Sequence, residues 1–199
     1  MLKKYDSKDY PNLEITMHEC IDDIVIINQW YQACLENIDW VEGEIKIFGK
    51  THKIPRLQAW YADKGINYKY SGKTLKHNYW NKDLIDIKSS IEALCKCTFN
   101  SVLANLYRDG SDSMGLHSDD EKELGHNPTI ASLSLGEERE IVFKNKNKNE
   151  NISLKIPQLH GQLLVMHGST QKYWKHEIKK TKKLKKPRIN LTFRNIISH

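Results

Sequence analysis

Short segments that alternate apolar and polar residues follow one another from residue 99 to the end of the chain, with turns between them. A period of two is typical of β-strands that bury one face. The segments that show it are residues 101–107, 129–135, 140–144, 152–156, 162–166 and 188–197. Regular strands separated by turns favour a double-sheet jelly roll, also called a double-stranded β-helix.

Two segments before these strands carry apolar residues at helical spacing, residues 22–36 and residues 84–95, and Asp83 is the expected N-cap of the second. We expect both helices to buttress a sheet, which makes the fold class α+β. The chain has 199 residues, shows no internal repeat or long linker, and is long enough for one full hydrophobic core. The sequence therefore predicts a single domain over residues 1–199.

The segment at residues 116–120 places His117 and Asp119 two positions apart. On an extended chain such residues point to the same face, where they can act as two ligands of one metal ion. A facial triad needs a second histidine and leaves the other positions open for substrates. A His–X–Asp triplet is common, so it indicates a metal only in company. His176 follows a turn at residues 168–170, and a strand returning across the jelly roll would place it opposite His117.

The segment at residues 188–194 has two faces of opposite character. One face carries Arg188, Asn190, Thr192 and Arg194, and the other carries Ile189, Leu191 and Phe193. A guanidinium matches a carboxylate through two parallel hydrogen bonds, which a lysine cannot make. Two arginines on one face near a metal therefore indicate a receptor for a dicarboxylate. The alternative for each arginine is an ordinary ion pair with a carboxylate of the core.

The order of these motifs resembles that of the AlkB family of iron- and 2-oxoglutarate-dependent dioxygenases, over roughly residues 48–197. The motifs are PRLQAWY at residues 55–61, YKYSG at 68–72, NLYR at 105–108, HSDDE at 117–121, His176, and PRINLTFR at 187–194. Within the family the chain is similar to the branch that repairs alkylated nucleic acids. FGK at residues 48–50 resembles the double-strand enzymes, whereas RLQAWY and HGQLLVMHGSTQ resemble the single-strand enzymes.

The resemblance implies an Fe(II) site and a binding site for 2-oxoglutarate, with dioxygen as the second cosubstrate. The implied iron ligands are His117, Asp119 and His176. The implied 2-oxoglutarate contacts are Arg188 at the distal carboxylate, Arg194 and Asn105 near the metal-bound end, and Tyr107, Asn190 and Thr192. The implied reaction is oxidative demethylation of 1-methyladenine and 3-methylcytosine in DNA, with RNA as an alternative. Formaldehyde and succinate are the implied products.

The resemblance also implies that residues 1–98 form an N-terminal extension with a nucleotide-recognition lid, and that residues 99–199 form the catalytic core. The implied substrate contacts are Phe48, Gly49, Lys50, Arg56, Trp60, Tyr68, Tyr70, Ser71, Asp120 and Glu121. Phe48 is either a wedge that fills the gap left by a flipped base or a hairpin residue that packs on the sheet. The aromatic residues either stack on the base or belong to the core. Asp120 suits a cationic base, and Glu121 is alternatively part of a surface ion pair.

Charge fits a polyanionic partner without deciding the matter. The chain has 31 Lys and Arg against 25 Asp and Glu, a net charge of +6, which biased codon usage would also produce. The Lys/Asn-rich stretch at residues 144–151 is expected to be an exposed hairpin loop. It and the lysine run at residues 179–186 are either phosphate-binding elements or solvated loops.

The remaining expectations concern the setting of the protein. Cys20, Cys34, Cys95 and Cys97 lack metal-site spacing and are expected to be free thiols in a reducing compartment. No apolar run reaches ~20 residues and the start lacks a signal-peptide pattern, so we expect a soluble, intracellular protein, in the cytoplasm or, if the source is eukaryotic, in the nucleus. We also expect a monomer. Two alternatives stay open: the same oxygenase chemistry on an RNA modification or a protein side chain, and a jelly-roll binding module without activity.

Overall fold

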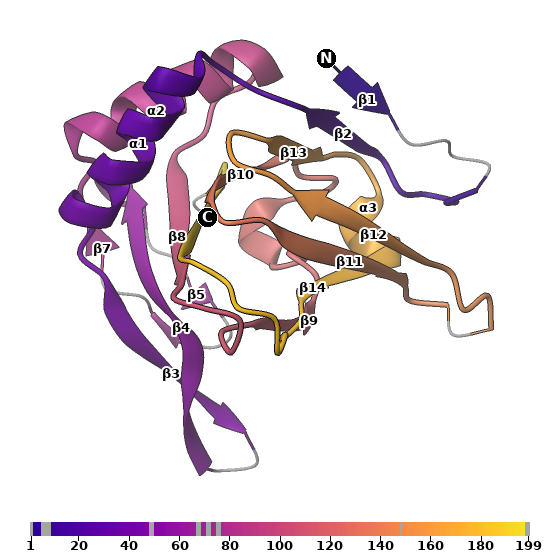
Figure 1. Cartoon of the computed structure of the whole chain (residues 1–199). Coiled ribbons are helices and arrows are strands. Elements are labelled where there is room, and N and C mark those ends of the chain that lie inside the picture. The colour runs from indigo at the N-terminus through magenta and orange to yellow at the C-terminus, as the bar shows by residue number, and fades with distance from the viewer. Residues whose placement is uncertain are drawn as a thin grey trace.

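Two β-sheets pack face to face in the computed structural model, and two helices cover the outer face of the larger sheet (Figure 1). The structure describes residues 2–4, 9–47, 50–66, 69–70, 73–74, 77–147 and 149–197, and the side chains of residues 9–44, 51–66, 77–147 and 149–197. Among these residues, no helix is long and apolar enough to cross a membrane.

The larger sheet holds the strands that carry most of the core. Its strands are β1 (Leu2–Lys4), β2 (Ile15–His18), β3 (Val41–Ile47), β4 (Lys50–Ala62), β7 (His77–Asn78), β8 (Ser101–Tyr107), β10 (Ile130–Gly136), β13 (Leu163–Met166) and β15 (Arg188–Arg194). Their order is β1-β2-β13-β10-β15-β8-β4-β3, and β7 pairs with β4. Neighbours far apart in sequence, such as β8 and β15, are therefore adjacent in the sheet.

The smaller sheet closes the other side of the sandwich. Its strands are β9 (Met114–His117), β11 (Arg139–Asn145), β12 (Ser153–Gln158) and β14 (Trp174–Ile178), in the order β12-β11-β14-β9. The other elements are the strand pair β5 (Lys69–Tyr70) and β6 (Lys73–Thr74), the helices α1 (Ile24–Asn37), α2 (Lys82–Cys95) and α3 (Thr170–Tyr173), and a 3-10 turn at Lys122–Leu124. This arrangement confirms the expected jelly roll with buttressing helices.

All six strands expected from alternation exist, and each begins within one residue of its expected start. β15 ends at Arg194 rather than residue 197, because its partner β8 begins at Ser101, which is paired with Arg194. The expected N-cap at Asp83 is wrong. Asn81 is the cap, and its side chain accepts a hydrogen bond from the backbone N of Leu84, which leaves Asp83 inside the first turn.

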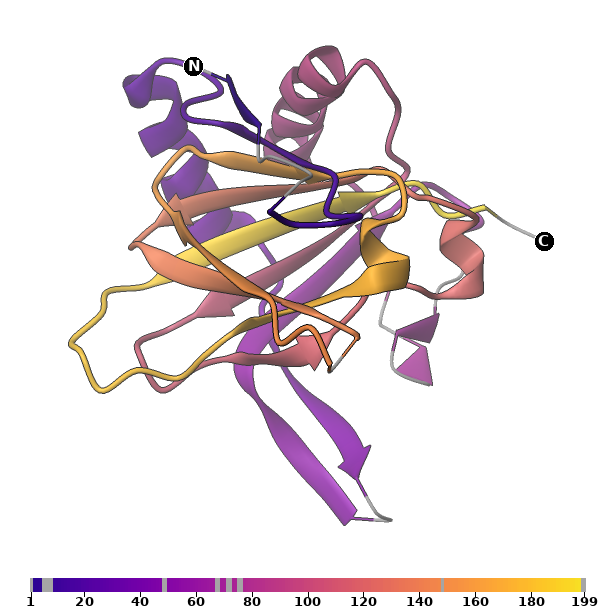
Figure 2. The ribbon, with the colours of Figure 1, turned by 90° about the vertical axis from the view of Figure 1, so that its right-hand side faces the viewer.

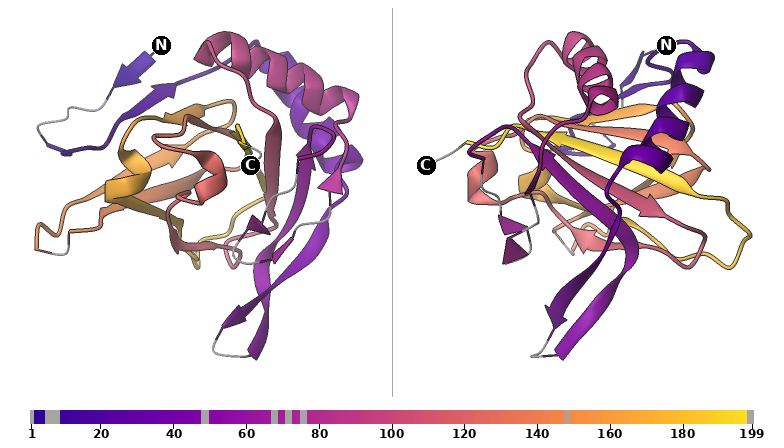
Figure 3. Two further views of the ribbon diagram at one scale, coloured as in Figure 1. Left: turned by 180° about the vertical axis from the view of Figure 1, so that it is seen from behind. Right: turned by 90° about the vertical axis from the view of Figure 1, so that its left-hand side faces the viewer.

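The central strands of the larger sheet, β8, β10, β13 and β15, are buried on both faces. On β15, Ile189, Leu191 and Phe193 face α1 and α2, in a cluster that includes Ile27 and Ile87 from those helices. The view in Figure 3 (right) shows the two helices lying across these strands. The opposite face of β15 points into the sandwich, toward β9 and β14. Alternation on one strand therefore separates the packing residues from the expected binding residues.

Two hairpins extend from this sandwich. β3 and β4 project well beyond the two sheets (Figure 2), with Ile47 paired to Lys50 at the far end. β11 and β12 form the second hairpin, which carries the Lys/Asn-rich stretch. The expected wedge at Phe48 and Gly49, and the expected contacts at Tyr68 and Ser71, lie outside the described residues. Lys50 and Tyr70 are described in their backbone only, as strand residues.

Candidate metal centre and cosubstrate cavity

The pairing of β9 with β14 brings the two histidines of the expected triad together. His117 is the last residue of β9, and its Cα is the register partner of His176 on β14. The two imidazole ring centroids are 4.3 Å apart. The expectation that a returning strand places His176 opposite His117 is confirmed.

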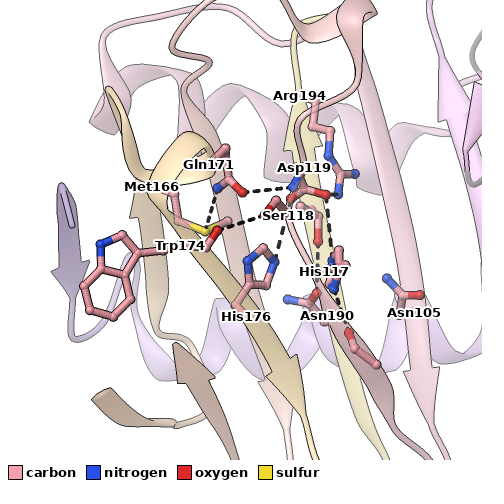
Figure 4. Close-up of polar contacts among 12 residues, drawn as sticks. Asn105, His117, Ser118, Asp119, Met166, Gln171, Trp174, His176, Asn190 and Arg194 are labelled. Atoms are coloured by element: carbon pink, nitrogen blue, oxygen red, sulfur yellow. Dashed lines mark hydrogen bonds and ion pairs between the residues drawn. The ribbon is translucent and has the colours of Figure 1, made fainter. Parts of the chain in front are cut away.

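Asp119 completes the group from the loop that follows β9. Its carboxylate oxygens lie 3.8 Å from Nε2 of His117 and 3.8 Å from Nε2 of His176. One candidate ligand atom from each residue lies within 4.8 Å of the others. Figure 4 shows the three side chains converging on one point, between the two sheets. Two imidazoles and one carboxylate in this arrangement form the donor set of a facial triad.

Burial and neighbouring charges keep this site in the protonation state that a metal needs. Burial opposes ionisation of Asp119, but Arg194 and the two histidines outweigh it and hold the pKa of the carboxyl at about 2. Burial lowers the pKa of His176 to about 3, so its imidazole is neutral near pH 7. Oδ1 of Asp119 accepts a hydrogen bond from Nη2 of Arg194 at 2.8 Å. Oδ2 accepts none from any residue that the structure describes, which leaves it available to a cation.

A cavity beside the triad collects the expected cosubstrate residues. Its lining includes Asn105, Tyr107, Arg188, Asn190, Thr192 and Arg194 together with His117, Asp119 and His176. The residues come from β8, β9, β14, β15 and the loop after β9, which are dispersed in the sequence. The sheet register is responsible: Arg188 pairs with Tyr107, and Asn190 pairs with Asn105.

Arg188 lies at one end of this cavity. It is 2 % exposed, and its Nε donates to Oγ of Ser134 at 2.9 Å. Its guanidinium carbon is 5.3 Å from the ring centroid of Tyr107. Nη1 has no hydrogen-bond acceptor among the described residues. Burial lowers the pKa of Arg188 to about 10, which still leaves it charged at neutral pH. A buried cation with an unused donor fits the carboxylate of a ligand.

The amides of the cavity are oriented by their neighbours. Nδ2 of Asn190 donates to Oγ of Ser132 at 2.8 Å, and Oδ1 of Asn190 accepts from Thr192 at 3.0 Å. Oδ1 of Asn105 accepts from Nε of Arg56 at 2.8 Å. The Nδ2 donor of Asn105 has no acceptor among the described residues. The unused donors of Asn105 and Arg188, with the open oxygen of Asp119, fit 2-oxoglutarate bound to a metal ion.

Two expected substrate residues lie in the interior. Arg56 is 5 % exposed, and besides Asn105 it donates to the backbone O of Ser113 at 3.1 Å. Trp60 is 3 % exposed and belongs to the core cluster between the sheets. Neither lines the cavity. Their positions favour orientation of Asn105 for Arg56 and packing for Trp60.

The two expected acids after Asp119 lie at the rim. Oδ2 of Asp120 accepts from Nζ of Lys146 at 3.1 Å, in an exposed ion pair. Glu121 is half-buried and precedes the 3-10 turn. Lys146 belongs to the Lys/Asn-rich stretch, so that hairpin reaches the mouth of the site. A hollow on its surface is lined by Leu116, Lys144, Asn145, Lys146, Asn147, Asn151, Ile152, Ser153 and Lys175.

Two residues with contacts at the site were not identified from the sequence. The guanidinium carbon of Arg139 lies 5.5 Å from the ring centroid of Tyr107, the same ring that Arg188 contacts. Arg139 also donates to the backbone O atoms of Asp109, Asp112 and Lys179. Gln171 accepts a hydrogen bond from the backbone N of Asp119. Gln171 belongs to the HGQLLVMHGSTQ motif, whereas nothing in the sequence distinguishes Arg139 from other strand arginines.

Comparisons with known proteins agree with this geometry. The family model described as the 2OG-Fe(II) oxygenase superfamily matches residues 19–194. The chain is 38% identical over 176 residues to the human protein named DNA oxidative demethylase ALKBH2, covering 84% of this chain and 67% of that protein. It is 43% identical over 154 residues to human alpha-ketoglutarate-dependent dioxygenase alkB homolog 3, covering 73% of this chain and 53% of that protein.

A solved structure supports the fold independently. The structure titled "The structure of OsALKBH1" superposes with a TM-score of 0.66 and covers 98% of this chain and 100% of that one. The sequence identity is 15%, so this likeness concerns the fold alone.

Proposed function

We propose, from the premise that the chain belongs to the 2OG-Fe(II) oxygenase superfamily, that it is an oxidative demethylase of N-alkylated bases in DNA. The resemblance of its motifs to the AlkB family is confirmed by relatives named as a DNA oxidative demethylase and as an alkB homolog. RNA is included in the proposal as a second substrate class. We further propose that residues 1–199 act as one monomeric oxygenase domain.

The observation that carries the proposal is the shared cavity. The expected metal ligands and the expected 2-oxoglutarate residues all line it. Bound Fe(II), with 2-oxoglutarate and dioxygen, supplies an oxidation that converts an N-methyl group to a hydroxymethyl group, while 2-oxoglutarate becomes succinate and CO₂. The hydroxymethyl group then leaves the base as formaldehyde.

The residues of the chain orient the reactants in this scheme. Arg188 would pair with one carboxylate of 2-oxoglutarate, and Nδ2 of Asn105 would donate to the other end. Arg194 holds one oxygen of Asp119, so the other oxygen faces the metal position. The hydrogen bonds that orient these three side chains exist before any ligand arrives: Arg188 to Ser134, Arg56 to Asn105, and Arg194 to Asp119. This preorganisation reduces the reorganisation needed during the reaction.

The rim supports a nucleic acid as the substrate. Lys144, Lys146 and Lys175 line the surface hollow beside Asp120, together with asparagine side chains that can donate to phosphate oxygens. The lysine run forms a second basic segment, in which the backbone N of Thr181 donates to the O of Gly110. A Cβ added at Gly110 would lie 2.6 Å from the O of Thr181, so this contact needs glycine.

The test is mass spectrometry of oligonucleotides that carry 1-methyladenine or 3-methylcytosine. Single-stranded DNA, duplex DNA and single-stranded RNA are incubated separately with Fe(II), 2-oxoglutarate and the protein. We expect loss of 14 mass units, one CH₂ (15 for a methyl minus 1 for the proton that replaces it), with equimolar succinate. His117→Ala is the inactive control.

Each outcome separates part of the proposal. Demethylation of DNA by the wild type alone supports it, and the RNA arm decides the second substrate class. Two outcomes would show that the proposed substrate is wrong and that the oxygenase acts on another molecule. In the first, succinate forms but no oligonucleotide loses its methyl group. In the second, the protein binds iron and 2-oxoglutarate but all oligonucleotides stay methylated and no succinate forms.

A further inference from the structure

The carboxylate of Asp119 is not positioned by a strand. β9 ends at His117, and residues 118–121 form an irregular loop. Two hydrogen bonds join this loop to the segment before His176. Oγ of Ser118 donates to the backbone O of Trp174 at 2.9 Å, and the backbone N of Asp119 donates to Oε1 of Gln171 at 2.9 Å (Figure 4).

The side chain of Gln171 has one orientation that satisfies its surroundings. It is 3 % exposed, and its Nε2 lies 3.2 Å from Sδ of Met166. With the amide reversed, Nε2 would face the N–H of Asp119, and two donors would oppose each other. Oε1 is therefore directed at Asp119, at the end of a buried side chain that solvent cannot replace.

The backbone that carries Gln171 is itself held in place. Gln171 lies in α3, next to Thr170. Oγ1 of Thr170 accepts from the backbone N of Glu14 at 2.8 Å and donates to its O at 3.1 Å. Oε1 of Glu14 accepts from the backbone N of Ser169 at 2.9 Å. α3 is thus joined to the segment just before β2.

We propose that Gln171 is a positioning residue for the metal site: its Oε1 holds the backbone N of Asp119 and thereby sets the direction of the Asp119 carboxylate. Arg194 holds Oδ1 of that carboxylate and Gln171 holds the backbone of the same residue. One contact fixes the carboxylate and the other fixes the backbone of the same short residue, so together they set the direction in which Oδ2 points. Without Oε1, the buried N–H of Asp119 would have no acceptor, which is unfavourable, so the loop would change conformation to pair it.

The proposal concerns the metal site alone, so its test needs no nucleic acid and does not depend on the substrate. The metal-free protein is titrated with Co(II), and the visible absorption of the bound ion reports both affinity and geometry. Gln171→Met keeps the length and apolar volume of the side chain but removes the acceptor. We expect Co(II) affinity about 10- to 100-fold weaker than in the wild type, with an altered absorption band.

Gln162→Met is the matched control. Gln162 is also buried, at 8 % exposure, and its Oε1 also accepts from a backbone N, that of Leu159 at 2.9 Å. It lies next to β13, outside the cavity. We expect this variant to lose similar thermal stability while its Co(II) affinity and absorption band match those of the wild type.

Gln171→Asn keeps the amide on a side chain one methylene shorter, and it provides the measurement if Gln171→Met does not fold. We expect weaker Co(II) binding than in the wild type. Folded Gln171 variants that bind Co(II) within twofold of the wild type, with the same band, would overturn the proposal. So would an equal loss of affinity in Gln162→Met, because the effect would then be general destabilisation.

Discussion

Charged side chains are buried and fixed inside the cavity but exposed at its rim. Inside the cavity, Arg188 and Arg194 are 2 % and 4 % exposed. Arg188 donates a hydrogen bond to Ser134, and Arg194 donates one to Asp119. At the rim, Lys144 pairs with Glu177 at 2.9 Å, but the lysine side chain is 41% exposed. Similar distances therefore have different consequences. Buried pairs fix geometry for chemistry, whereas exposed pairs exchange partners readily and can follow a substrate.

Removal of a metal ligand on the cavity side should have the largest effect. His117→Ala should abolish Co(II) binding and turnover, because two remaining ligands do not form the facial triad. The His117 side chain is 23% exposed, so the fold should persist, as measured by circular dichroism. The control is His126→Ala, at an exposed position outside the site, and it should bind and turn over normally. Measurable turnover in folded His117→Ala would disprove the metal assignment.

Replacement of Asp119 removes two interactions at once. Asp119→Ala should also abolish metal binding, but it removes the buried partner of Arg194 as well. Breaking a buried pair costs roughly 3–5 kcal/mol, so we expect this variant to be less stable than His117→Ala. Urea unfolding of both proteins measures the difference.

Arg188 tests whether fixed geometry matters as much as charge. Arg188→Lys keeps the charge but cannot donate through Nε to Ser134 and through a second nitrogen to a carboxylate. We expect the KM for 2-oxoglutarate to rise by about 100-fold, equivalent to about 2.7 kcal/mol, with little change in Co(II) affinity. Arg108→Lys, at a half-exposed arginine paired with Asp112, is the control. A KM within threefold of the wild type would contradict the assigned role.

The buried histidine predicts how the metal-free protein responds to acid. Burial lowers the pKa of His176 from 6.5 to about 3, so between these pH values the unfolded chain binds a proton that the folded protein does not. Stability is therefore full above about pH 6.5 and falls as the pH drops toward 3. From pH 7 to pH 5 we expect a loss of about 2 kcal/mol from this residue. The window for Asp119, between 3.8 and about 2, lies lower.

Urea unfolding of the wild type and of His176→Gln at both pH values isolates this contribution. His18 and His160 also have pKa values lowered by burial, so the wild type alone would not assign the loss. A parallel pH dependence of the two proteins would show that His176 is not responsible.

Neutralising the rim should have the smallest effect, and one that depends on salt. The double variant Lys144→Gln, Lys175→Gln should weaken oligonucleotide binding several-fold at low salt and lower the slope of log affinity against log salt by about two. Lys155→Gln is the control, because Lys155 is exposed but does not line the hollow. Co(II) affinity should not change. An unchanged salt slope in the double variant would exclude this hollow from the nucleic-acid path.

Local patterns predicted the strands well because apolar and polar side chains alternate along them, even where both faces are buried. β15 is the clearest example: its alternation identified both the residues that pack against the helices and those that face the cavity. The helix cap at Asn81 was missed because Asp83 is equally suitable in composition, and only backbone geometry distinguishes them. Arg56 and Trp60 were expected at the substrate, but the sequence does not show that β4 is buried on both faces, one against the helices and the other between the two sheets.

The sequence by itself determined the strand series, the residue types of the triad and the family, since these depend on short-range alternation and on motifs. Only the tertiary structure decided how these residues meet. His117 and His176 are register partners across a pair of strands, and Asp119 is directed by Gln171 and Arg194, which lie far along the chain. Hydrogen-bond partners between distant segments depend on the packing of the whole sandwich, and no local pattern encodes that packing.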